Sequence, residues 1–181
     1  AAKKKRRTRI TISLVIGTVV LAAVVLGIRA LGQGPSAEAP DRIRIADEGR
    51  KHVSEGSSPT YSASPPASGA HYPVWSRYGV LREPVDPGYW VHNLEHGAIV
   101  LLYSCTENCD TVAAKIEEVY DSLPNGDFGE VKLVATPYAG EFEGTFMLIA
   151  WTWQEPFEIF DAARVEKFYG DFVDRGPEQA P

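Results

Sequence analysis

Apolar residues recur with a regular period only in the second half of the chain. Residues 97–103 form an apolar run that predicts a buried strand, and residues 131–136 and 145–153 predict two more. Residues 110–122 and 161–174 carry apolar side chains at helical spacing. The predicted order is therefore strand, helix, strand, strand, helix. A right-handed crossover, then a hairpin and a covering helix, would give a small mixed sheet.

The fold class that this order predicts is α+β. The order is close to the core of a thioredoxin-like fold with one element missing, which is an analogy of fold and assigns no function. The half of the domain before Gly97 is rich in loops. Residues 42–46 alternate like a short edge strand, whereas residues 65–73 hold too many prolines and glycines for a helix or a central strand. We expect residues 65–73 to be an ordered loop.

The longest apolar run lies near the start of the chain. Residues 10–28 are 19 uncharged residues, which would span roughly 28 Å as a helix, about the hydrocarbon thickness of a bilayer. A cleaved signal peptide is the alternative, because Ala37-Glu38-Ala39 resembles a small-x-small cleavage site, but the run exceeds the usual signal core of about 7–15 residues. We expect a basic tail, a transmembrane helix, a linker and a folded domain over residues 1–9, 10–31, 32–41 and 42–181.

Charge is divided unevenly between these regions. Seven of the 18 basic residues and none of the 24 acidic residues lie in residues 1–31, so the net charge of −6 conceals a basic start and a strongly acidic remainder. The positive-inside rule then places the tail in the cytoplasm and the domain outside the cell membrane. An acidic domain excludes a nucleic-acid partner. The partners that we expect are the lipid bilayer and a larger membrane protein complex.

The four histidines of the chain all lie between residues 52 and 96. His92 and His96 are four residues apart, so one helical face or a tight turn brings them together, and His71 lies in the proline-rich loop. We predict a metal site at His71, His92 and His96, with His52 joining them and Glu95 fixing an imidazole tautomer. The alternative is that these histidines only fix loops, in an accessory subunit that binds no metal.

The identity of the metal follows less directly from the residues. Imidazole suits copper and zinc alike, and the expected extracytoplasmic location favours copper. Met147 is a conceivable soft axial ligand, although its place in an apolar strand favours packing in the core.

Two patterns leave an enzyme open. The run from His92 to His96 fits the H-x-x-E-H motif of inverted zinc peptidases, but a strand follows at Gly97 and leaves little room for the helix that this motif needs. Cys105 and Cys109, the only cysteines, lie between a strand and a helix. A disulfide is the default outside the cytoplasm, and a redox or Cu(I) pair at the helix N-terminus is the alternative. Glu107 and Asp110 oppose a thiolate, so we expect an inert disulfide. We assign no catalytic residue.

Four sequence blocks, taken together and in this order, resemble a known family. They are GRKHV, PPASGAHYPVW, VHNLEHGA, and YSC with a second cysteine at Cys109, and they extend over about residues 48–151. The series is similar to the bacterial domain-of-unknown-function family numbered 3105. Its common form of the second block is PPTSGPHY, in which Ala67 and Ala70 stand here for the Thr and the last Pro. The resemblance implies a membrane-anchored extracytoplasmic domain with a histidine-rich signature, and it implies no reaction.

Overall fold

The apolar runs in the second half of the chain form the centre of one sheet. The computed structural model describes residues 42–180, in which six strands pair in the order β1-β6-β5-β3-β4-β2. β3 is parallel to β4 and antiparallel to β5, and β5 is antiparallel to β6. The strands are β1 (Ile43–Arg44), β2 (Gly79–Val80), β3 (Ile99–Tyr103), β4 (Leu133–Pro137), β5 (Phe146–Ala150) and β6 (Trp153–Phe157). The mixed α+β class is confirmed.

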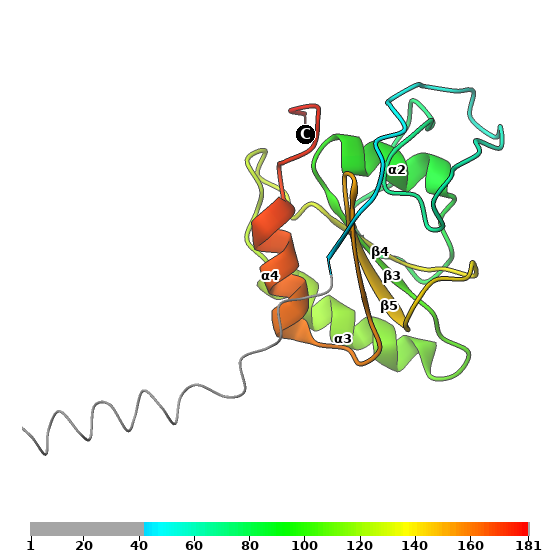
Figure 1. Ribbon diagram of the computed structural model, residues 1–181. Helices are drawn as coiled ribbons and strands as arrows, with labels where there is room; N and C mark the ends of the chain where they lie inside the picture. The colour runs from blue at the N-terminus through cyan, green and yellow to red at the C-terminus, as the bar shows by residue number, and fades with distance from the viewer. Residues whose placement is uncertain (1–41, 181) are drawn as a thin grey trace, which may run out of the picture. The chain divides into compact units, whose positions relative to one another are not determined.

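Helices cover both faces of this sheet. Helix α2 (Pro87–Glu95) lies on one face, and α3 (Cys109–Ser122) and α4 (Ala162–Phe172) lie on the other (Figure 1). Ile99, Leu101 and Tyr103 of β3 pack with α3 and α4. Val100 and Leu102, which point the other way, pack with α2. This double burial explains why β3 is apolar at every position.

The sequence misjudged how the later strands pair. The expected hairpin between residues 131–136 and 145–153 is wrong, because β4 and β5 lie on opposite sides of β3. The run 145–153 is also more than one strand: β5 ends at Ala150, a turn with Thr152 at φ 64° follows, and β6 begins at Trp153. The hairpin therefore joins β5 to β6. A strand that is apolar on both faces takes the centre of the sheet, which separates its two neighbours.

The C-terminal residues return to the end of α2. We call residues 174–180 the C-terminal strap. Its amide groups at Asp174 and Glu178 donate to the carbonyls of Gly97 (2.9 Å) and Glu95 (3.0 Å). The buried Lys132 donates from Nζ to the carbonyls of His96 (2.8 Å) and Ala180 (2.7 Å). These bonds satisfy carbonyls that a helix end leaves without partners.

The expected tail, transmembrane helix and linker, residues 1–9, 10–31 and 32–41, lie outside the described residues. Within residues 42–180, no helix combines the length and the apolar character needed to cross a bilayer.

Candidate metal centre

Helix α2 positions the side chains of His92, Glu95 and His96. Asp86 caps its first turn by accepting a hydrogen bond from Gly88 N (2.7 Å), and Pro87 fits the first helical position. The helix ends where Gly97 adopts a φ of 80°. His92 and Glu95 are three residues apart and share one face of the helix, and His96 is the residue that caps its C-terminus. A helix of nine residues thus fits before Gly97, where the sequence indicated little room for one.

A backbone ladder brings the other two histidines to this helix. The segment containing His52 pairs in parallel with the one containing His71: Val53 N donates to His71 O (2.8 Å), and His71 N donates to Lys51 O (3.0 Å). Residues 65–69 of the proline-rich loop are buried, so this loop is ordered as expected. Tyr72 N then ties the loop to α2 by donating to Gly88 O (2.8 Å).

These elements place three imidazoles in a triangle around one carboxylate. The ring centroids of His52, His71 and His92 are 4.9, 5.0 and 4.9 Å apart. One ligand atom from each of these rings and one carboxylate oxygen of Glu95 all lie within 4.8 Å of one another. His71, His92 and Glu95 are buried, whereas the side chain of His52 is 51% exposed. The cluster is therefore open to solvent on the His52 side.

Backbone carbonyls fix the tautomers of two rings. Nδ1 of His71 lies 2.8 Å from Gly69 O, and Nδ1 of His92 lies 2.8 Å from Tyr72 O. A carbonyl oxygen can only accept, so both Nδ1 atoms carry protons, and in the neutral ring each Nε2 presents a lone pair. Burial, with the adjacent rings of His96 and His71, lowers the pKa of His92 to about 4, so His92 is neutral at pH 7.

Each of these two Nε2 atoms lies close to another candidate ligand atom. Nε2 of His71 is 2.9 Å from Oε2 of Glu95, and Nε2 of His92 is 3.1 Å from Nε2 of His96. Such separations are those of two neighbouring ligands on one ion, because metal–nitrogen bonds are about 2.0–2.1 Å long. The donor set therefore fits a bound metal ion.

His96 belongs to a second group on the same carboxylate. Ligand atoms of Glu95, His96 and Glu178 also lie within 4.8 Å of one another, and Glu178 is supplied by the C-terminal strap. Arg50 lies on the other side of Glu95, with its Nε 3.7 Å from Oε1. The guanidinium offsets part of the charge of this buried carboxylate. Glu95 is thus the shared centre of the whole arrangement.

A tryptophan covers the histidines on α2. The ring centroid of Trp75 lies 5.4 Å from that of His92 and 5.2 Å from that of His96, and Trp75 is 44% exposed. The buried side chain of Asn93 clamps the next residue, because it accepts from Ser76 N (2.9 Å) and donates to Ser76 O (2.8 Å). Asn93 therefore sets the position of the loop that carries Trp75.

Comparison with known proteins assigns the chain to a family. A sequence model described as "Protein of unknown function (DUF3105)" matches residues 52–181, which is well over half of the chain. The chain belongs to the DUF3105 family. No curated protein and no solved structure gives a match. All four histidines, Glu95 and both cysteines of this DUF3105 domain lie within the matched residues.

The HNLEHG block of the DUF3105 domain can now be interpreted residue by residue. His92 and Glu95 belong to the cluster and His96 to the second ligand group. Asn93 fixes the Trp75 loop, Leu94 is fully buried in the core, and Gly97 ends the helix. The sequence predicted the four histidines as ligands and Glu95 as the group that fixes an imidazole tautomer, and these roles stay predictions. Asn93, Trp75, Arg50 and Glu178 were not singled out, since each acts through a contact distant in the sequence.

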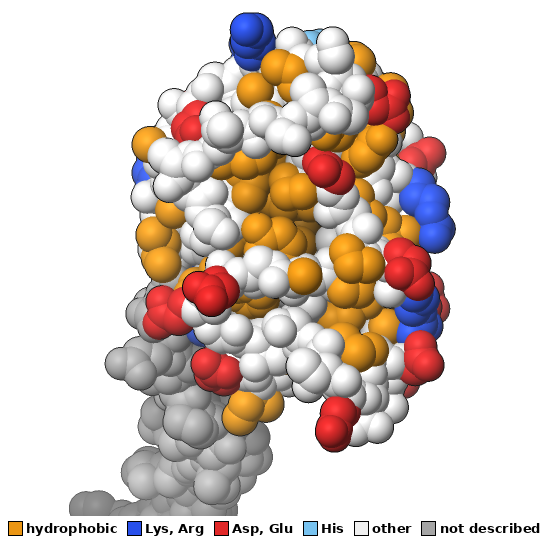
Figure 2. Space-filling view, turned by 90° about the vertical axis from the view of Figure 1, so that its right-hand side faces the viewer, with side chains coloured by type: hydrophobic (Ala, Val, Ile, Leu, Met, Phe, Trp, Pro, Cys, Tyr) orange, Lys and Arg blue, Asp and Glu red, His pale blue; other side chains and the backbone are white. Residues whose placement is uncertain are grey.

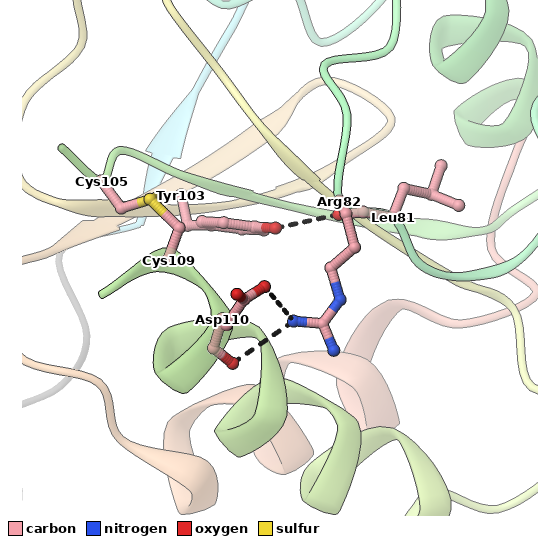
Figure 3. Close-up of a disulfide and its surroundings, with 6 residues drawn as sticks. All are labelled: Leu81, Arg82, Tyr103, Cys105, Cys109 and Asp110. Atoms are coloured by element: carbon pink, nitrogen blue, oxygen red, sulfur yellow. Dashed lines mark hydrogen bonds and ion pairs between the residues drawn. A yellow bond between two sulfur atoms is a disulfide. The ribbon is translucent and has the colours of Figure 1, made fainter. Parts of the chain in front are cut away.

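The remaining candidates lie elsewhere in the DUF3105 domain. Met147 is 3% exposed and packs in the core beneath α2. Cys105 and Cys109 form a disulfide with their Cα atoms 5.6 Å apart, which confirms the expected bridge (Figure 3). The bridge joins the end of β3 to the first residue of α3. The metal-ligand candidates precede β3 in the chain and the disulfide follows it, so the two features lie at opposite ends of this strand.

Proposed function

We propose that this domain binds one transition-metal ion through His52, His71, His92 and Glu95. The observation that carries the proposal is the convergence of three imidazoles and a carboxylate within 4.8 Å, two of the rings having their tautomers set by backbone carbonyls. Fixing Nδ1–H on a backbone oxygen is how proteins prepare Nε2 as a ligand.

We favour copper over zinc as the ion. Imidazole nitrogen and carboxylate oxygen suit both metals, but Cu²⁺ is bound most tightly among the divalent first-row ions by such a donor set. When bound, copper would supply a one-electron redox centre or a Lewis acid. The half-exposed His52 leaves one side of the cluster open. An ion could therefore enter and leave without unfolding of the buried part.

Metal content is the direct test of this proposal. The full chain, stripped with a chelator and dialysed against equal Cu²⁺ and Zn²⁺, should retain one equivalent of metal, mostly copper, by elemental analysis. His71→Ala/His92→Ala should retain none. Glu95→Gln should weaken binding at least tenfold, whereas Glu118→Gln, an exposed carboxylate on α3, should not. A wild-type chain that retains no metal while its circular dichroism shows it folded would remove the proposal.

Trp75 offers an independent readout of the same site. The centroid of its ring lies 5.4 Å from that of His92 and 5.2 Å from that of His96. Paramagnetic Cu²⁺ at the cluster should therefore quench its fluorescence, and Zn²⁺ should not. Trp75→Phe should remove most of the quenching and leave metal retention unchanged. Quenching that persists fully in this variant would place the copper elsewhere.

We also propose that the sheet core is thioredoxin-like. The strand order β6-β5-β3-β4 supports this proposal. So do the parallel pairing of β3 with β4, which α3 connects along the chain, and the position of α3 and α4 on the same face of the sheet. A thioredoxin core has this order, with one further helix before the hairpin. Here α2, which precedes β3, covers the face that such a helix would protect.

The proposed location is the outer side of a bacterial cell membrane, with residues 10–31 as the anchor. The apolar run, the basic residues before it and the acidic domain after it support this orientation. The Cys105–Cys109 disulfide adds support, because such bonds persist mainly in oxidising compartments. Figure 2 shows hydrophobic side chains gathered in a hollow with acidic side chains around it, a surface typical of contact sites and consistent with a larger membrane complex as the partner.

A further inference from the structure

The disulfide occupies a chemically favourable position. Cys109 is the first residue of α3, and both cysteines are partly exposed. Backbone N–H groups of a helix N-terminus stabilise negative charge, and a thiolate placed there has a lowered pKa. A partly exposed sulfur can also be reached by an external thiolate, whereas a fully buried structural disulfide cannot.

A cation distant in the sequence lies at the same helix end. Arg82 Nη1 lies 3.3 Å from Asp110 O and 3.4 Å from Asp110 Oδ1 (Figure 3). Its Nη2 is 2.8 Å from Glu117 Oε1. The segment carrying Arg82 is held there because Tyr103 OH donates to Leu81 O (2.9 Å). The expectation of an inert disulfide rested on Glu107 and Asp110, which both oppose a thiolate. Arg82, from another element, offsets the charge of Asp110, and the charge of the exposed Glu107 is screened by solvent.

We propose that Cys105–Cys109 is a redox-active disulfide that exchanges with the dithiol of a partner protein. The position between a strand and a helix in the thioredoxin-like strand order is the one where redox dithiols are held in that fold. Partial exposure, the helix N-terminus and Arg82 together provide access and charge stabilisation. The activity is separate from metal binding, since the histidines and the disulfide lie at opposite ends of β3.

The exchange conserves atoms and electrons. A thiolate of the partner attacks Sγ of Cys105, the S–S bond breaks, and Cys109 leaves as a thiolate at the N-terminus of α3, where it is best stabilised. The second thiolate of the partner then attacks the partner sulfur that is bonded to Cys105 in the mixed disulfide, and Cys105 leaves as a thiolate. The partner is oxidised to a disulfide by loss of two electrons and two protons, and Cys105 and Cys109 become two thiols. The reverse sequence oxidises a partner dithiol.

The test is a redox titration of the full chain in detergent with a chelator present. The oxidised protein is equilibrated with glutathione buffers of increasing reduced fraction, quenched with acid, alkylated and weighed by mass spectrometry. Thiolate absorbance of the reduced protein gives the pKa of each thiol. We expect reversible reduction with unchanged circular dichroism and one thiol pKa below the free-cysteine value of about 8.5.

Variants at Arg82 separate this account from a simple exposed bridge. Arg82→Gln should raise the pKa of the more acidic thiol and slow reduction by dithiothreitol roughly threefold, because a more basic leaving thiolate departs more slowly. Arg82→Lys should restore most of the rate, and Arg77→Gln, an exposed arginine before β2, should change neither value. Thiol pKa values at or above about 8.5 in the wild-type chain, or reduction only on unfolding, would overturn the proposal.

Discussion

His92 shows at the scale of one residue how the fold prepares a ligand. Its Nδ1–H is bound to Tyr72 O, its ring is buried, and its Nε2 faces His96. Burial and the neighbouring His96 disfavour a second proton on the ring. The hydrogen bond to the Tyr72 carbonyl favours that proton, and it also orients the ring. Burial is the largest cause of the lowered pKa. The result is a neutral imidazole with an unprotonated Nε2, the form that a metal requires.

The lowered pKa of His92 gives a pH prediction for the metal-free protein. The pKa is about 4 in the folded chain and 6.5 in the unfolded chain. The unfolded chain therefore binds more protons between these values, and the contribution of His92 to the free energy of unfolding, complete above pH 6.5, is lost progressively as the pH falls toward 4. Urea unfolding at several pH values in chelator should show this decline.

The control for this pH dependence is His92→Gln, which cannot titrate. Its free energy of unfolding should fall less steeply over the same interval than that of the wild-type chain. Parallel curves for the two proteins would show that His92 does not have the lowered pKa.

At the scale of elements, the metal cluster depends on the contact between α2 and the C-terminal strap. Gly176 lies so close to the end of α2 that an added Cβ would meet Glu95 O and Gly97 N. Lys132, which is 1% exposed, bonds to His96 O (2.8 Å) and pairs with Asp174 (3.0 Å). The strap thus holds the backbone at Glu95, the residue that both ligand groups share, and Lys132 links His96 to the strap.

Gly176→Ala tests this dependence. The Cβ should push the strap from α2, lower the free energy of unfolding by about 1–3 kcal/mol, as overpacking typically does, and weaken metal binding several-fold by loosening Glu95. Gly170→Ala in α4 is the matched control, because nothing lies within 4 Å of its added Cβ and alanine is the better helix former. Calorimetry and metal titration of both variants give the answer, and equal behaviour of the two would contradict the role of the strap.

The elements also show what the sequence could and could not predict. The helices near residues 110–122 and 161–174 carry long periodic stripes, and the structure confirms them as α3 and α4. Helix α2 was missed because it has nine residues, starts with Pro87 and Gly88, and is buried from Trp90 to Glu95, so that no exposed polar face marks it as amphipathic. The convergence of His52 and His71 on α2 depends on pairing between loops, which leaves no periodic signal in the sequence. Arg82 reaches Asp110 through strand placement, and spacing alone could not indicate it.

At the scale of the whole molecule, the described domain separates the two proposed sites. The candidate metal cluster lies with α2 on one face of the sheet and before β3, and the disulfide lies at α3 on the other face and after β3. A change at one site is therefore expected to leave the other intact. Cys105→Ser/Cys109→Ser should lose about 2 kcal/mol of stability from the short closed loop. The metal content of this double variant should match that of the wild-type chain.

The proposed orientation in the membrane is tested on intact cells. Protease added to spheroplasts should digest the acidic domain and spare a tag placed before Lys3, because the basic tail is expected in the cytoplasm. Lysed spheroplasts serve as the control and should lose both. Protection of the domain in intact spheroplasts would contradict the orientation.

The most direct test of the central claim is electron paramagnetic resonance of the copper-loaded chain. The account predicts a single Cu²⁺ species with hyperfine coupling to the imidazole nitrogens of His52, His71 and His92. One nitrogen coupling should be lost in His71→Ala and one in His92→Ala, and Glu118→Gln should give the wild-type spectrum. A copper spectrum without imidazole coupling, or one that neither histidine substitution changes, would contradict the assignment of this cluster as the metal centre.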